Sequence, residues 1–334
     1  MPEVKSYYGY RLLAVDGTDI NIPCDPKDGS TYFQTFENAQ GYNLLHLTAL
    51  YDLRNRLYVD YIVQPRLEKN EIQALSQMVN RSSLDGPSII LGDRGFESYN
   101  AFVHLEKIGI KYATRVKDVE STGILSGLSL PDGEFDIDVK KILTRKQTKE
   151  VKKSPEIYKV LWSHTVFDHF DDDGFCPVFF RVVRFKLRTG GYESIITNLD
   201  RVKFPPDSIK ELYNMRWGIE TSFRELKYTI GLSMLHAKKM DSILQEISAR
   251  LIMYNFCEVI VNSIIISQKN RKYSYKVNFT IAVDICIQFF RYRGNDPPDV
   301  GTSIQKYISP VRDGRAFTRV ILPKGFVSFV YRVA

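Results

Sequence analysis

Four polar residues with complementary chemistry fall on one face of a predicted helix. They are spaced three, four and seven residues apart: Tyr213, Arg216, Glu220 and Lys227. At about 100° per residue, this spacing keeps the four side chains within roughly 60° of arc. A carboxylate beside two cations could belong to a reactive site. It could equally form salt bridges on a solvated stripe, because Arg216 and Glu220 are an i, i+4 pair.

The same helix carries two further acids, and both point away from this face. The helix is predicted to run from Asp207, a good N-cap residue, to Ile230. Its apolar residues form one core-facing stripe: Leu212, Met215, Ile219, Phe223, Leu226 and Ile230. Glu211 and Glu225 lie about 180° and 140° from Glu220. If one acid of this helix joins a site, geometry therefore selects Glu220.

Two of the predicted strands nearer the N-terminus end in an aspartate. Asp16 follows the apolar run Arg11–Val15, and Asp93 lies two residues after Pro87–Leu91. The expected order is strand, strand, strand, helix, strand, helix, strand, over 11–15, 42–51, 56–63, 68–80, 87–91, 98–107 and 111–116. The second and third strands are predicted to form a hairpin.

The sequence pattern changes at about residue 118, from alternating strands and helices to successive strands. Residues 159–167 and 177–187 flank a turn signal at 171–174, so we expect antiparallel strands there, followed by another strand at 192–198. The basic run 140–153 is either a solvated loop or a phosphate contact. Helices are expected over 242–267 and 279–291.

Composition and charge narrow the class of protein. The chain has 334 residues, 44% of them apolar and 25% charged, as in a globular protein. Its net charge of +7 permits a polyanionic partner without requiring one. The four cysteines lie far apart, which argues against a disulfide scaffold or a zinc ribbon and favours reduced thiols in a cytosol. The most apolar run, 251–266, is too short and too polar to span a membrane.

Other candidate ligand sets lack support. The acidic turn at 171–174 fails the calcium-loop pattern, because His169 and Phe180 occupy positions that need an acid. The five histidines show no H-x-x-x-H spacing. Asp19 lies three residues beyond Asp16 and would face the other way on an extended strand.

The motifs together resemble a known family. The spacing Y-x2-R-x3-E-x6-K, at 213–227, is similar to the signature of DDE transposases of the insertion-sequence-four family. That family places its first catalytic Asp before Gly-Thr or a similar pair, and its second before Arg-Gly. The matching motifs here are Asp16-Gly17-Thr18 and Asp93-Arg94-Gly95. The three blocks occur in the family's order, and the resemblance covers about residues 10–260.

The resemblance implies a fold. It implies an α/β, ribonuclease H-like mixed sheet flanked by helices, with an antiparallel β insertion before the helix that carries the third acid. The corresponding regions are 1–117 for the first part of the core, 118–205 for the β-rich insertion, 206–268 for the helical part of the core, and 269–334 for a C-terminal region.

The resemblance also implies catalytic residues and cofactors. Asp16, Asp93 and Glu220 would be the catalytic acids and the ligands of two divalent metal ions, Mg²⁺ or Mn²⁺. Two such ions, about 3.5–4 Å apart, can support an in-line displacement on a phosphodiester. Three crowded acids repel one another unless a cation lies between them. Tyr213, Arg216 and Lys227 would contact DNA phosphates near the transposon end.

The resemblance implies partners and leaves alternatives open. The partners would be double-stranded DNA, as transposon ends and target, and a second copy in a synaptic homodimer, without a membrane. Family members usually carry a helical DNA-binding domain before the first Asp, and Asp16 comes too early for one, so we expect a catalytic core without it. A non-cleaving, DNA-binding or inhibitory remnant and a stand-alone metal-dependent nuclease are the alternatives. The expected location is the cytoplasm of a prokaryotic cell, at the nucleoid.

Overall fold

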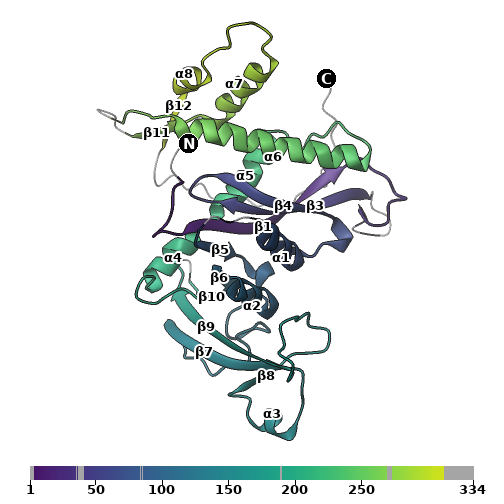
Figure 1. Ribbon diagram of the computed structural model, residues 1–334, viewed down its shortest axis with the longest axis vertical. Helices are drawn as coiled ribbons and strands as arrows, with labels where there is room; N and C mark the ends of the chain where they lie inside the picture. The colour runs from purple at the N-terminus through teal and green to yellow at the C-terminus, as the bar shows by residue number, and fades with distance from the viewer. Residues whose placement is uncertain are drawn as a thin grey trace.

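A computed structural model describes residues 4–311, apart from 35, 37–40, 83, 85, 189 and 269–272. Within these residues, ten strands form one mixed sheet, and helices flank it (Figure 1). The strand order is β2-β3-β1-β5-β6-β10-β9-β7-β8, with β4 paired to β3. The molecule is elongated, with α6, α7 and α8 at one end and β7, β8 and α3 at the other (Figure 1).

The central strands have the connectivity that the sequence predicted. They are β1 (Arg11–Ile22), β3 (Tyr42–Asp52), β4 (Leu57–Pro65), β5 (Ser88–Gly92) and β6 (Lys111–Val116). β1, β3 and β4 are antiparallel neighbours, whereas β1, β5 and β6 are parallel. A short strand, β2 (Tyr32–Phe33), also pairs with β3. The order β4-β3-β1-β5-β6 is that of a ribonuclease H-like sheet, so the predicted fold class is confirmed.

β1 is longer than predicted, and Asp16 lies within it rather than at its end. The antiparallel pairing with β3 continues to Ile22. The parallel pairing with β5 stops earlier, at Ala14 opposite Leu91. The part of β1 that pairs with β5 therefore ends at Ala14, two residues before Asp16.

Alternate residues of β1 face two different layers. Leu13 and Val15 pack in a core with α1 (Glu71–Arg81) and α2 (Tyr99–Lys107). Ala14 belongs to a core on the opposite face, formed with α5 (Trp217–Tyr228) and α6 (Met240–Ser263). This alternation, which has a period of two residues in any strand, sends Asp16 toward α5.

The predicted hairpin between 159–167 and 177–187 is wrong. The long strand β9 (Phe175–Lys186) pairs with β10 (Tyr192–Thr197) and with β7 (Phe135–Thr144), and β7 pairs in parallel with the short strand β8 (Tyr158–Val160). β10 pairs with β6, so these strands extend the central sheet.

The prediction missed β7 because one face of this strand is charged. Arg181 of β9 pairs with Asp136 of β7 at 2.7 Å, and Arg201 pairs with both Asp136 and Asp138. Ile137 and Val139, which alternate with these acids along the strand, pack into the core of the β insertion. The basic run 140–153 is split between the end of β7 and the short helix α3 (Lys149–Lys153).

The predicted helix from Asp207 to Ile230 is two helices. α4 (Pro206–Asn214) ends before α5 begins. Backbone hydrogen bonds between residues three apart in the sequence close the tight turn that joins the two helices. Arg216 N–H donates to Tyr213 O at 3.0 Å, and Ile219 N–H donates to Arg216 O at 3.1 Å. The backbone stays right-handed through the turn, so Arg216 and Glu220 remain neighbours.

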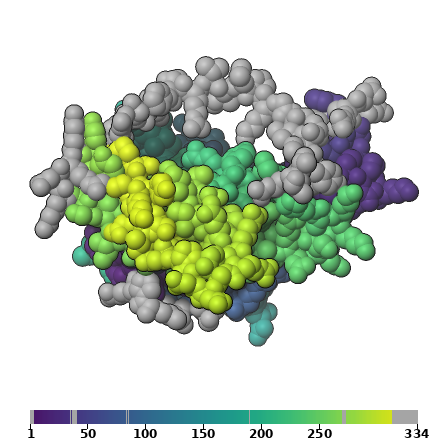
Figure 2. Space-filling model, turned by 90° about the horizontal axis from the view of Figure 1, so that it is seen from above, coloured from purple at the N-terminus to yellow at the C-terminus, as the bar shows by residue number. Residues whose placement is uncertain are grey.

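Three further helices cover the end of the molecule opposite β7, β8 and α3. α6 packs on β4, and α7 (Phe279–Arg291) and α8 (Val300–Gln305) lie on α6. Figure 2 shows these helices on the surface of this end. The strands β11 (Ser274–Val277) and β12 (Ile308–Val311) pair beside them. The short helices η1 (Arg66–Glu68) and η2 (Arg94–Phe96) precede α1 and α2.

Of the expected C-terminal region 269–334, residues 269–272 and 312–334 lie outside the described residues. None of the described helices has the length and hydropathy of a membrane span.

Candidate active site

Asp16 and Asp93 lie on neighbouring strands where their parallel pairing ends. Asp93 directly follows Gly92, the last residue of β5, and Asp16 lies two residues beyond the Ala14–Leu91 pair. Open α/β sheets bind ligands outside the carboxyl ends of their parallel strands. The two aspartates therefore occupy the edge of the sheet at which a ligand site is expected.

Backbone amides hold one oxygen of each aspartate. The Gly17 N–H donates to Asp16 Oδ1 at 2.8 Å, and the Gly95 N–H donates to Asp93 Oδ1 at the same distance. The second bond makes Asp93 the N-cap of η2. One oxygen of each acid is thus fixed locally, which leaves the other, Oδ2, for a ligand or a counter-ion.

Arg216 joins the third acid to the first. Its Nη2 lies 2.7 Å from Glu220 Oε1, and its Nη1 lies 3.3 Å from Asp16 Oδ2. The guanidinium is 5% exposed and packs against Trp217, with Cζ 5.3 Å from the ring centroid. A single buried cation therefore bridges two of the three predicted catalytic acids.

The electrostatics of Asp16 reflect this crowding. Burial is the main cause that raises the pKa of Asp16 to about 6, and the negative charges of Asp93 and Glu220 raise it further. The Gly17 N–H and the Arg216 charge act in the opposite direction. In Arg216 itself, burial is outweighed by the nearby acidic groups, so its pKa is raised and it stays charged. Asp93 and Glu220 are therefore both close enough to Asp16 to affect its charge.

The donor chemistry fits a divalent cation, but Arg216 already engages Asp16 Oδ2 and Glu220 Oε1. Carboxylate oxygens are the ligands that Mg²⁺ and Mn²⁺ prefer, and mutual repulsion among the acids favours a cation between them. Among the described residues, no group of three or more Asp, Glu, His or Cys side chains stands ready to hold a metal ion. In this arrangement the guanidinium of Arg216 is the cation.

Tyr213 lies behind the acids rather than on the surface. Its ring is 3% exposed, and its hydroxyl is buried without a hydrogen-bond partner among the described residues. Burial raises the pKa of Tyr213 to about 12, with Arg216 opposing the shift and Glu193 adding to it. In this arrangement the Tyr213 hydroxyl is therefore not exposed in the way that its predicted contact with a DNA phosphate requires.

Arg115 is a cation of this edge that the sequence analysis did not single out. It follows Thr114, which is opposite Gly92 in the parallel pairing of β5 with β6, so it lies beside Asp93. Its Nε is 2.9 Å from Glu193 Oε1. The available signal was the position of Arg115 one residue before the end of the 111–116 strand, next to the strand that precedes Asp93.

Lys227 reaches the far part of the same strand as Asp16. Its Nζ donates to the carbonyl oxygen of Asp19 at 2.7 Å. The carboxylate of Asp19 points to the opposite face of β1, where it lies 2.6 Å from His46 Nδ1. The exclusion of Asp19 from the acidic site agrees with this placement.

A second charged cluster packs behind Gly17. His46 Nε2 is 2.9 Å from Glu71 Oε1, so His46 lies between Glu71 and Asp19. A Cβ on Gly17 would lie 2.3 Å from both His46 Nε2 and Glu71 Oε1. The glycine after Asp16 is therefore needed for the close approach of this cluster, which no spacing in the sequence revealed.

A large cavity has Arg94, the residue after Asp93, in its wall, whereas Asp93 itself does not line it. Its volume is about 1200 Å³, and it lies between the start of α2 and the β insertion. Four cations contribute to its wall: Arg94, Lys117, Lys152 and Lys159. Trp162, which is 71% exposed, also lines it, with Asp168 and Glu97 as acids. The cavity is large and basic enough for part of a nucleic acid strand.

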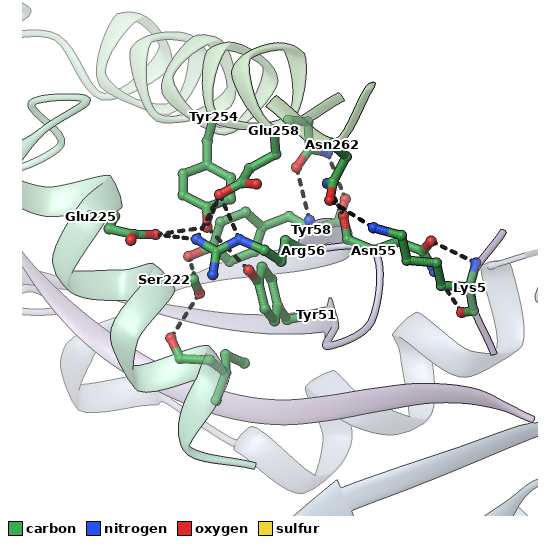
Figure 3. A network of polar contacts seen from close by, with 12 residues as sticks. Lys5, Tyr51, Asn55, Arg56, Tyr58, Ser222, Glu225, Tyr254, Glu258 and Asn262 are labelled. Carbon is green, nitrogen blue, oxygen red and sulfur yellow. Dashed lines mark hydrogen bonds and ion pairs between the residues drawn. The ribbon is translucent and has the colours of Figure 1, made fainter. Parts of the chain in front are cut away.

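A polar network fixes the helix that carries Glu220. Arg56, in the β3–β4 hairpin, contacts Glu225 of α5 and Glu258 of α6 (Figure 3). The Tyr254 hydroxyl donates to Glu225 Oε2 at 3.1 Å. Because Glu225 lies on the side of α5 away from Glu220, this network holds the helix from behind.

Comparisons with known proteins identify the family of this chain. A family described as "Transposase DDE domain" matches residues 7–256. A solved structure, "Cryo-EM structure of piggyBac transposase synaptic complex with hairpin DNA", is similar at a TM-score of 0.45 and 13% identity. That match covers 92% of this chain and 59% of the other, so this chain spans less than two thirds of the relative's length. No curated protein matches the sequence.

Proposed function

Because this chain belongs to the transposase DDE domain family, we propose that it is a transposase catalytic core that cleaves DNA and transfers strands at transposon ends. The reaction would be metal-dependent phosphoryl transfer on the acids Asp16, Asp93 and Glu220. The observation that carries this proposal is the placement of these acids at one sheet edge, where Asp16 and Asp93 follow adjoining parallel strands and Glu220 is tied to Asp16 through Arg216.

The three acids would hold the divalent ions. Asp16 and Asp93 would contribute from the sheet and Glu220 from α5. Bound ions supply positive charge that activates the attacking hydroxyl and stabilises the departing oxygen. The protein's part is to keep carboxylates of like charge close together at a partly buried edge. The hydrogen bonds that the Gly17 and Gly95 N–H groups donate do this by fixing one oxygen of each aspartate.

Cations around the acids would position the DNA. Lys227 and Arg216 are proposed to contact phosphates, and a guanidinium suits bidentate phosphate binding. Tyr213 would support them from the buried side. The basic cavity lined by Arg94, the residue after Asp93, would give a strand a path toward the β insertion. Phosphate contacts of this kind make affinity depend steeply on salt.

Several finer features belong to the same proposal. We place the chain in the insertion-sequence-four family, with the divisions at residues 117, 205 and 268, and with Mg²⁺ or Mn²⁺ as the metal. We propose that two copies act on paired transposon ends, and that the protein works at the nucleoid of a prokaryotic cell. The Y-x2-R-x3-E-x6-K spacing supports the family placement.

A strand-transfer assay tests the function. The protein is incubated with Mg²⁺, a labelled duplex that ends in a 3′-hydroxyl, and a supercoiled target plasmid. A transposase core joins the duplex to the plasmid. Hydrolysis products alone would instead indicate a stand-alone nuclease, and DNA binding without either product would indicate a non-cleaving remnant.

A further inference from the structure

The position of Arg216 suits neither a direct contact with a DNA phosphate nor a metal site formed by the nearby acids. As a phosphate contact it should be accessible to DNA, yet it is 5% exposed and its Nε is buried without a hydrogen-bond partner among the described residues. As a neighbour of a metal site it should leave the acids available. Instead, it bonds to both Asp16 and Glu220.

The same oxygens cannot serve a guanidinium and a metal ion equally well. Asp16 Oδ1 already accepts from the Gly17 N–H, so Oδ2 is its remaining oxygen, and Arg216 holds that one. Arg216 also holds Glu220 Oε1. A divalent ion at these acids would in addition face the charge of a guanidinium fixed between them. Arg216 and the metal therefore compete.

The aromatic residues beside Arg216 offer its guanidinium a second position, away from the acids. Its guanidinium packs against Trp217 at 5.3 Å and lies 5.8 Å from the Tyr213 ring centroid. Trp217 is 58% exposed, so this aromatic contact leads from the two acids toward solvent. A phosphate beside Trp217 would offer the guanidinium a partner outside the acidic site.

We propose that Arg216 is a built-in counter-ion that holds Asp16 and Glu220 until a DNA phosphate draws its guanidinium away, which couples metal loading to DNA binding. This regulation rests on the proposed function of the acids. In the free protein, Arg216 screens two acids from the metal. On DNA, the same arginine binds phosphate and the acids become available. By thermodynamic linkage, DNA raises metal affinity by the factor by which metal raises DNA affinity.

The first test measures Mn²⁺ binding to the free protein by calorimetry, without DNA. Arg216→Gln removes the competing charge and is expected to raise Mn²⁺ affinity at least about fivefold, the lower end of typical coupling factors. Arg224→Gln is the matched control, because Arg224 is an exposed arginine of α5, the helix that begins directly after Arg216. Its Mn²⁺ affinity is expected to equal that of the unaltered protein.

Arg216→Lys provides a second variant if loss of the buried charge prevents folding. A lysine carries one ammonium group instead of a two-armed fork, so it releases at least one carboxylate. Its Mn²⁺ affinity is expected to lie above that of the unaltered protein. Equal or weaker Mn²⁺ binding by the folded Arg216 variants would overturn the proposal.

The second test follows the arginine itself. The chain has two tryptophans, so Trp162→Phe leaves Trp217 as the sole tryptophan reporter beside Arg216. Adding a short DNA duplex in metal-free buffer is expected to change Trp217 emission. The change should disappear when Arg216→Gln is added to this background. An emission change of the same size with and without Arg216 would contradict movement of the arginine.

The outcomes separate this inference from the proposed function. If Mn²⁺ binds and the Arg216 variants leave its affinity unaltered, the coupling fails and the metal site stands. If Mn²⁺ binds to none of the proteins, with or without DNA, both the coupling and the metal-dependent function fail.

Discussion

The guanidinium of Arg56 lies 2.9 Å from the carboxylate of Glu225, and this ion pair joins the β3–β4 hairpin to the helix that carries Glu220 (Figure 3). Arg56 has a backbone φ of 57°, which is unfavourable for a residue with a side chain. The pairs with Glu225 and with Glu258, the latter fully buried, offset that strain. The hairpin thus sets the position of α5 from behind the acidic site.

Removing Arg56 is expected to destabilise the fold. In Arg56→Met, the buried Glu258 loses its cation, and Glu225 loses its link to the hairpin. Because the Arg56 side chain is 40% exposed, we expect a loss of about 2 kcal/mol, below the usual range for a fully buried pair. Urea unfolding measures this loss. Arg54→Met, at an exposed position of the same hairpin, is the control, and an equal loss there would discredit the role of the ion pair.

Glu220→Gln is expected to abolish Mg²⁺-dependent cleavage. The substitution removes a charged metal ligand, so the rate should fall at least about a hundredfold. The fold and the DNA affinity should stay nearly unaltered, as checked by circular dichroism and by gel shift. Glu211→Gln, at an exposed position of α4, is the matched control and should cleave normally.

Glu225→Gln tests the assignment of faces on α5. Cleavage per folded molecule should change little, because Glu225 lies away from the sheet edge and pairs with Arg56. Its thermal stability should fall modestly, by about 1 kcal/mol for a weakened hydrogen bond to a charged group. Cleavage losses equal to those of Glu220→Gln would show that the helical-face argument is wrong.

Lys227→Ala is expected to weaken DNA binding more than metal binding. Lys227 is proposed to contact phosphate, so its loss should reduce the slope of log affinity against log salt by about one. Fluorescence anisotropy over a series of salt concentrations measures that slope. Calorimetry with Mn²⁺ should show little change, and the reverse pattern would count against the proposed role of Lys227.

Stability is expected to depend on pH through His46. Burial opposes its charged form, but the hydrogen bonds with Asp19 and Glu71 outweigh burial and raise the pKa of His46. This contribution is fully present below about pH 6.5 and is lost as pH rises through the folded-state pKa. The hydrogen bond with His46 also lowers the pKa of Glu71, and it lowers that of Asp19 despite burial. The contribution of these acids is present above about pH 4.5 and is lost in acid.

His46→Gln should therefore lower the melting temperature most between about pH 4.5 and 6.5. The difference from the unaltered protein should shrink toward alkaline pH, as measured by thermal melts in a series of buffers. His164→Gln, at an exposed histidine, controls for removal of an imidazole. A difference that grows as the pH rises would contradict the charged state assigned to His46.

Local sequence patterns were sufficient for the elements of the core. Short apolar runs predicted β5 and β6 to within one residue at each end, and helical periodicity predicted α7 over Phe279–Arg291. Asp16 and Asp93 were identified because each follows such a run. These signals succeed because burial of one strand or one helix face imposes a short repeat on the residues that form it.

Pairings between distant segments could not be derived in the same way. β7 was missed because its acids pair with Arg181 and Arg201, far along the chain, so its charges resembled those of a solvated loop. The tight turn at Arg216 keeps right-handed dihedral angles and leaves the apolar periodicity intact, so the sequence indicated one continuous helix.

The sequence by itself determined which acids this protein offers and on which elements they lie, because residue type and short spacing are local properties. Only the tertiary structure decided that Arg216 bridges Asp16 and Glu220, and that His46 lies between Asp19 and Glu71. The reason is physical. A buried charge takes the partner that the packing of strands and helices brings within reach, and 200 residues separate Asp16 from Arg216.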